Sequence, residues 1–80
     1  MTYATQNLNV AVALHATNVL PFKRCVRISP VQVEFEFGDP KHIGDDLALA
    51  FDKSELTAPV NSTLASLRYL RRKMSEALRD

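Results

Sequence analysis

Apolar and polar residues alternate more strictly in the stretch 31–37 than anywhere else in the chain. In its sequence, VQVEFEF, every odd position is apolar and every even position is polar. Successive side chains of a β-strand point to opposite faces, so this pattern predicts a strand with one apolar and one polar face. The preceding stretch 22–29, FKRCVRIS, predicts a second strand with Val26 and Ile28 turned toward the core.

The Ser-Pro dipeptide at 29–30 indicates a tight antiparallel hairpin between the two predicted strands. Proline suits the second position of a type I turn because its ring fixes the backbone angle needed there. A turn centred on Pro30 and Val31 predicts three cross-strand pairs: Ile28 with Val33, Val26 with Phe35, and Arg27 with Glu34. A lone hairpin is only marginally stable in water, so helices must cover its apolar face.

Two helices are predicted to flank this hairpin, one near each end of the chain. The first covers residues 6–17, with Thr5 as its N-cap and Asn18 in a left-handed terminal position. The last begins after Pro59. Its apolar residues recur at helical spacing and form one continuous stripe: Val60, Leu64, Leu67, Leu70, Met74, Ala77 and Leu78.

The segment GDPKHIGDD holds the densest group of chemically capable side chains. Four of them could form a metal or acid–base site, or mark the start of a middle helix: Asp39, His42, Asp45 and Asp46. Asp39 followed by Pro40 is typical of a helix start and puts His42 at the third helical position. A helix would scatter the four side chains, whereas a divalent metal needs three or four convergent ligands. The helix start is therefore the preferred interpretation.

Charge is distributed in three blocks. Residues 1–31 carry three basic and no acidic residues, residues 32–56 seven acidic and two basic ones, and residues 57–80 five basic and two acidic ones. This pattern predicts an acidic and a basic surface, unless the blocks pair with each other in the fold. On the last helix, Arg68, Arg72 and Arg79 fall within a narrow band that could follow a phosphate backbone or an acidic protein surface. The alternative is a solvated flank, with Arg72 paired to Glu76.

Composition narrows the function classes. Eighty residues predict one domain, 1–80, and no apolar run approaches the roughly 20 residues of a membrane span. The N-terminus does not resemble a signal peptide, and Cys25 is the only cysteine, which favours a cytoplasmic location. Cys25 is interpreted as an ordinary strand residue and His15 as a structural histidine. The sequence holds no nucleotide-loop or zinc-protease motif, so no enzyme activity, catalytic residue, metal or cofactor is predicted.

Several stretches together resemble a small family of phage and integrative-element proteins of unknown function. They are the spaced residues T…L…A…L in 5–14, the strand VEFEF, a helix opened by an acid and ending in Phe51, and LRYLRRKM. The family often has glycine where Asn18 stands, in keeping with a left-handed position. The resemblance carries no active site and implies a setting, namely mobile DNA and its conflicts with a host.

The sequence thus predicts an α+β domain of order α-β-β-α-α, with a two-stranded hairpin packed under helices. Its predicted function is that of a non-enzymatic phage or mobile-element accessory protein that binds DNA or RNA. The candidate contact residues are Arg68, Arg71, Arg72, Lys73 and Arg79, with Lys23, Arg24 and Arg27 adding to the surface. The alternative is a protein-interaction module, such as an anti-CRISPR-like inhibitor of a host defence protein. That module would present either the acidic segment 34–55 or the basic helix.

Overall fold

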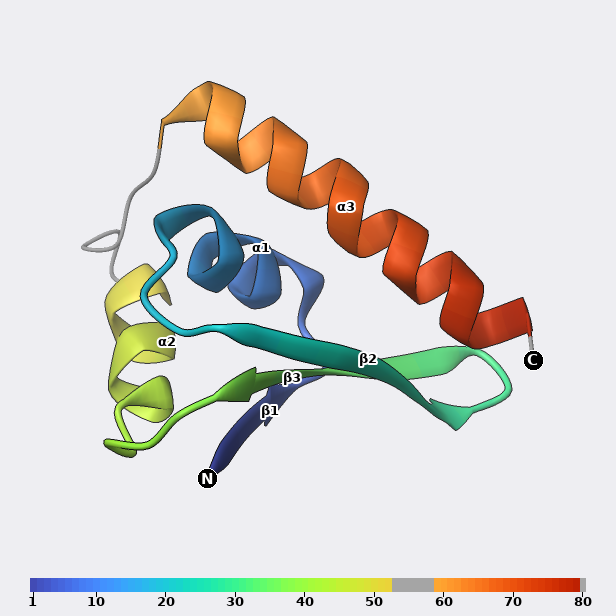
Figure 1. Ribbon diagram of the computed structural model, residues 1–80, viewed down its shortest axis with the longest axis horizontal. Coiled ribbons are helices and arrows are strands. Elements are labelled where there is room, and N and C mark those ends of the chain that lie inside the picture. The colour runs from blue at the N-terminus through green and yellow to red at the C-terminus, as the bar shows by residue number, and fades with distance from the viewer. Residues whose placement is uncertain (53–58, 80) are drawn as a thin grey trace.

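Three antiparallel strands form a sheet that helices cover on one face only (Figure 1). The structure, a computed structural model, describes residues 1–52 and 59–79. Its elements are β1 (Thr2–Thr5), α1 (Leu8–Thr17), β2 (Phe22–Ser29), β3 (Gln32–Gly38), α2 (Gly44–Asp52) and α3 (Val60–Arg79). The strand order is β1-β3-β2, and α3 packs on α1 and along β2. The predicted α+β class is confirmed.

The prediction of only two strands is wrong, because the N-terminal residues form a third strand, β1. Thr2–Thr5 pairs with β3 in a register that sets Tyr3 opposite Phe37. The first helix begins later than predicted, because the Asn7 side-chain oxygen accepts the Asn9 and Val10 N–H groups at 2.9 and 3.3 Å. Thr5 is therefore not the N-cap. Asn18 does end the helix in the left-handed region, at φ 55°.

The faces of β2 are also opposite to those predicted. The turn lies at residues 30–31 as expected, since Ser29 pairs with Gln32. However, a β-bulge between Arg27 and Ser29 leaves Ile28 without a partner, and the upstream pairs are Arg27–Val33, Val26–Glu34 and Cys25–Phe35. An extra residue in one strand moves every following side chain to the other face. All three predicted pairs are therefore wrong, and Cys25 rather than Val26 lies beside the core.

The faces of β3 are those that its alternation predicts. Val33, Phe35 and Phe37 are buried, and Phe35 and Phe37 are at most 1% exposed. They meet α1 and α3 in a single core whose other buried members are Val10, Ala11, Val12, Leu14, Leu20 and Leu70. These residues place the core between β3 and the helices that cover it. Burial of each large apolar side chain contributes roughly 1.5–3 kcal/mol.

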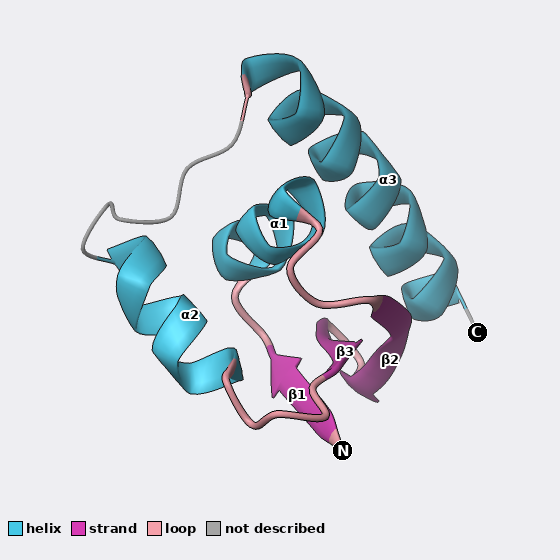
Figure 2. Cartoon of the chain, turned by 60° about the vertical axis from the view of Figure 1, so that its left-hand side comes forward, coloured by secondary structure: helices cyan, strands magenta, loops and turns pink. Residues whose placement is uncertain are grey.

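Only the later part of the predicted α3 stripe is buried. Leu70 is fully buried and Leu67 and Met74 pack at the edge of the core, but Leu64 is 46% and Val60 73% exposed. A helix of 20 residues is about 30 Å long, and its first turns lie above α1, farther from the sheet than its last turns (Figures 1 and 2). In the described part of the chain, no helix combines the length and apolar character needed to cross a bilayer.

Candidate functional site

The Asp39 cluster serves the start of α2. The Asp39 carboxylate is buried, and its two oxygens accept the Ile43 and Gly44 N–H groups at 2.9 and 2.8 Å. A carboxylate at this end of a helix also interacts favourably with the helix dipole. The prediction that Asp39 accepts N–H groups at a helix start is thus confirmed, but the predicted first residue of the helix is wrong. The helix starts at Gly44, and His42 lies in the preceding turn with φ 56° instead of at the third helical position.

Gly44 allows this helix start to lie directly against β1. A Cβ atom added at Gly44 would come within 2.4 Å of the Tyr3 side chain, far inside van der Waals contact. Among the residues that the structure describes, no three His, Cys, Asp or Glu side chains are close enough to bind a metal. The cluster that the sequence singles out is accordingly part of the framework.

His15 joins α1 to α3 through polar and aromatic contacts. Its Nδ1 atom lies 2.7 Å from the Ser66 Oγ atom, and its ring stacks on Tyr69 with centroids 5.0 Å apart. Phe22 meets both rings edge-on. Partial burial lowers the pKa of His15 below its usual value. Ser66 is only 4% exposed, so the contact is internal and ties the two helices together.

The arginines of α3 point away from this framework. Arg68, Arg71, Arg72 and Arg79 are all exposed, and in the described ranges none of them pairs with an acidic side chain. At 100° per residue, Arg68, Arg72 and Arg79 lie opposite the buried Leu70. The Arg72 guanidinium also lies 5.6 Å from the centre of the Tyr69 ring. These four residues are called the α3 arginines below.

Lys73 takes a different position on the same helix. It is half-buried, and its Nζ atom lies 3.5 Å from Glu76 Oε1 and 5.6 Å from the centre of the Tyr69 ring. The ion pair with Glu76 is therefore made by Lys73 and not by Arg72. Lys73 points toward β2 rather than toward the outer side of α3, since it lines a groove with strand residues.

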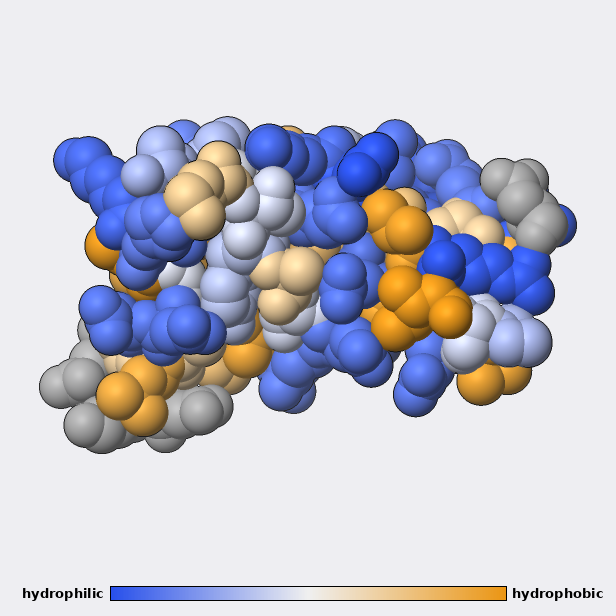
Figure 3. All heavy atoms as spheres, turned by 90° about the horizontal axis from the view of Figure 1, so that it is seen from below, coloured by the Kyte–Doolittle hydropathy of each residue, from blue (hydrophilic) through white to orange (hydrophobic). Residues whose placement is uncertain are grey.

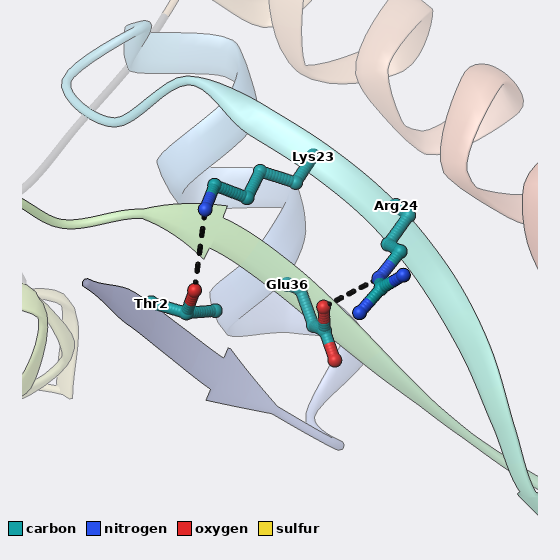
Figure 4. A network of polar contacts seen from close by, with 4 residues as sticks. All are labelled: Thr2, Lys23, Arg24 and Glu36. Carbon is teal, nitrogen blue, oxygen red and sulfur yellow. Dashed lines mark hydrogen bonds and ion pairs between the residues drawn. The ribbon is translucent and has the colours of Figure 1, made fainter.

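The basic residues of β2 lie on a separate surface. Lys23 Nζ donates to Thr2 Oγ1 at 3.3 Å, and Arg24 Nε donates to Glu36 Oε1 at 2.7 Å (Figure 4). Both side chains lie on the open face of the sheet, which is largely hydrophilic (Figure 3). The bulge between Phe22 and Arg24 includes Lys23 and lets its side chain cross β3 to reach β1. The eight predicted contact residues therefore do not form one surface.

Arg27 lies apart from both groups, near the β2–β3 turn. Its Nε atom donates to the Ser29 carbonyl at 3.2 Å, and it stands opposite Val33 in the sheet. A bond from a guanidinium to a backbone carbonyl two residues away stabilises the irregular end of the strand. Arg27 thus supports the hairpin that the bulge distorts.

A groove of about 320 Å³ runs between β2 and α3. The strand residues Phe22–Cys25 form one wall, and Tyr69, Lys73, Glu76 and Ala77 form the other. Burial raises the pKa of the Cys25 thiol, which disfavours the reactive thiolate. The sequence does not predict this groove, because the groove depends on how α3 lies along β2. Tyr69 is the lining residue of α3 whose type could have indicated a binding surface.

The acidic segment 34–55 does not form a continuous surface from its described side chains. Asp39 is buried and Glu36 pairs with Arg24. Asp45 and Asp46 are exposed in the first turn of α2. Residues 52 and 55, which also belong to this segment, lie outside the described side chains. The protein itself uses two of these carboxylates, which leaves fewer for an acidic partner surface.

Comparison with models of protein families, with curated protein sequences and with solved structures finds no significant match to this chain.

Proposed function

We propose that this protein is a small accessory or regulatory protein, without catalytic activity, that binds nucleic acid through the α3 arginines. The observation that carries the proposal is the contrast in pairing. Lys23, Arg24 and Lys73 each contact a partner within the fold, whereas the α3 arginines have no acidic partner among the described residues. Exposed guanidinium groups that no carboxylate occupies are available to phosphate oxygens.

The spacing of the α3 arginines supports contact with several phosphates. Arg68 and Arg79 are eleven positions apart, about 16 Å along a helix axis at 1.5 Å per residue. Duplex DNA carries one phosphate charge per roughly 1.7 Å of its axis, so a surface of this length faces several phosphates. Phosphate contacts fix position without reading bases, which predicts binding with little sequence preference.

The resemblance to phage and integrative-element proteins supports a setting in which such binding would act. A protein of this kind would meet mobile DNA or its transcripts in the cytoplasm. An acidic protein surface could use the same arginines. However, the exposed apolar residues described in α3, Val60 and Leu64, precede all four arginines along the helix and do not lie among them, so they would not form the apolar centre of an interface built on the arginines. Nucleic acid is therefore the preferred partner of this surface.

Fluorescence anisotropy with labelled duplex DNA, single-stranded DNA and an RNA hairpin tests the proposal. We expect binding at about 50 mM salt that weakens steeply toward 200 mM. The triple substitution Arg68→Gln, Arg72→Gln and Arg79→Gln should abolish it, whereas Lys41→Gln, which removes an exposed lysine outside α3, should not. Circular dichroism would confirm that the triple variant is folded. Absence of binding by the unmodified protein at low salt would overturn the proposal.

A further inference from the structure

Strand β2 is an edge of the sheet with a groove beside it. Among the described residues, its only strand partner is β3. In the described part of the chain, the backbone of Phe22–Val26 makes no hydrogen bond outside the pairing with β3. An edge strand presents a row of N–H and C=O groups that another extended segment can match. Here that row borders the groove under α3, whose far wall includes Tyr69, Lys73 and Ala77.

The two bulges limit where pairing can occur. β2 is irregular between Phe22 and Arg24 and again between Arg27 and Ser29, and it is regular over the four residues between. Bulges protect edge strands from indiscriminate association. A short regular stretch beside a groove therefore favours a short strand with matching side chains over an extended aggregate.

We propose that this groove binds an extended peptide segment with alternating apolar and acidic residues, which adds a strand to the β2 edge. β3, the strand already paired with β2, shows the chemistry that β2 accepts. Its apolar residues face the helices, and its Glu36 pairs with Arg24 on the open face at 2.7 Å. A segment on the other edge would turn its apolar side chains into the groove, toward Tyr69 and Ala77. Its acidic side chains would lie on the open face, the side of the sheet that also carries the Lys23 and Arg24 side chains.

Charge around the groove favours an acidic segment. Among the described residues, the lining includes three basic residues, Lys23, Arg24 and Lys73, and one acidic residue, Glu76. Glu36 and Glu76 each offset one of these charges, but the Lys23 ammonium donates to the uncharged Thr2 hydroxyl, so the lining stays net basic. A second copy of this chain paired through its own β2 would bring two basic strands together, because β2 contains no acidic residue. Like charges directly opposite each other destabilise a pair of strands. The charge therefore favours a separate acidic partner over self-association.

The groove also suits a peptide better than a nucleic acid. Single-stranded nucleic acids bind chiefly by stacking bases on exposed aromatic rings. The Tyr69 ring already stacks on His15 and lies beneath the side chains of Arg72 and Lys73. The alternating backbone donors and acceptors of an edge strand, by contrast, match those of another peptide chain.

Solution NMR of the ¹⁵N-labelled protein tests this proposal with a defined probe. The probe is a capped heptapeptide with the β3 sequence QVEFEFG, and its control is QVKFKFG. We expect saturable shifts in β2 and slower amide exchange there, by about tenfold, with no such protection in β1. The lysine peptide should bind about tenfold more weakly, and Lys23→Gln and Lys73→Gln should each weaken binding of the glutamate peptide about two- to fivefold.

Matched controls separate this proposal from the one for α3. Lys41→Gln should leave peptide binding unchanged, since Lys41 lies outside the groove. The proposal is overturned if the glutamate peptide does not perturb β2 at millimolar concentration, or if the two peptides bind equally. It is also overturned if a single-stranded DNA protects the β2 amides more strongly than the peptide does. DNA that perturbs only α3 would support both proposals as separate surfaces.

Discussion

Charged side chains of the sheet and of α3 are used in opposite ways. In the sheet and the turn that follows it, the protein itself supplies the partners: Glu36 for Arg24, Thr2 for Lys23, and two backbone N–H groups for Asp39. On the outer side of α3, the exposed arginines lack acidic partners in the described ranges. Both regions carry charged side chains. Those of the sheet contact other groups of the same chain, whereas the described arginines of α3 contact no acidic side chain.

This difference teaches that the number of charges does not identify a binding surface. The segment GDPKHIGDD holds the densest group of chemically capable side chains in the sequence, yet its first aspartate, Asp39, is buried and holds the start of α2. The α3 arginines resemble an ordinary solvated helix flank. Their lack of acidic partners among the described residues distinguishes them. The substitutions below separate groups that the fold needs from groups that it does not.

The largest effect should come from the core face of the sheet. Phe35→Ala removes a side chain that is 1% exposed, and should lower the free energy of unfolding by roughly 3–5 kcal/mol. A native domain has only about 5–15 kcal/mol of stability, so the variant would be barely folded. Leu64→Ala, at a position 46% exposed, should cost less than about 1 kcal/mol. Urea denaturation would measure both, and equal losses would contradict the assignment of the core.

Asp39→Ala should have the next largest effect. It leaves the Ile43 and Gly44 N–H groups without their acceptor in a buried site, at a cost of about 2–3 kcal/mol. Asp39→Asn should recover only part of this loss, because one of its two terminal atoms is a donor. The helix content and the urea midpoint would report the result. Full recovery by asparagine would show that one acceptor suffices.

His15 should give a smaller, pH-dependent effect. Burial lowers its pKa in the folded protein, so below about pH 6.5 the unfolded chain binds the proton more readily. The stability that His15 contributes is therefore present above pH 6.5 and declines as the pH falls toward the lowered pKa. The urea midpoints of the protein and of His15→Gln should converge between pH 7.5 and 5. A constant difference would show that His15 is not desolvated.

The Arg24–Glu36 pair should contribute least among these internal contacts. The Arg24 side chain is 70% exposed, and ion pairs in contact with water stabilise proteins by about 0–1 kcal/mol. Arg24→Gln should therefore lower stability by less than about 1 kcal/mol, and added salt should reduce the difference. Thermal denaturation at low and high salt would measure it. A loss above about 2 kcal/mol would mean that the pair is part of the core framework.

The sequence predicts those features that follow from local pattern. The alternation in 31–37 is a strict period of two and correctly assigns the faces of β3, although Val31 at its start lies in the turn and is 82% exposed. Asn18 takes the left-handed conformation expected of it. Strand β1 escapes prediction because four residues are too few for a period, and TYAT pairs only through contact with β3. The faces of β2 cannot be deduced because a bulge adds one residue without altering the apolar pattern.

The sequence likewise predicts only the part of the candidate site that follows from local spacing. Helical spacing alone places Arg68, Arg72 and Arg79 on the outer side of the last helix. It cannot reveal that Lys23 and Arg24 belong to the opposite face of the sheet, since that depends on a bulge and on strand order. The pairing of Lys73 with Glu76 and the groove beside them likewise depend on how α3 lies along β2.

The salt dependence of nucleic-acid binding tests the central claim most directly. If the α3 arginines contact three to five phosphates, the log–log slope on duplex DNA should be roughly −2.7 to −4.5. Arg68→Gln or Arg79→Gln should each reduce that slope by about one unit, with stability changed by less than about 0.5 kcal/mol. Arg24→Gln should leave the slope unchanged, because Glu36 already pairs with the Arg24 guanidinium. Equal slopes for all these variants, or no binding at low salt, would contradict the account.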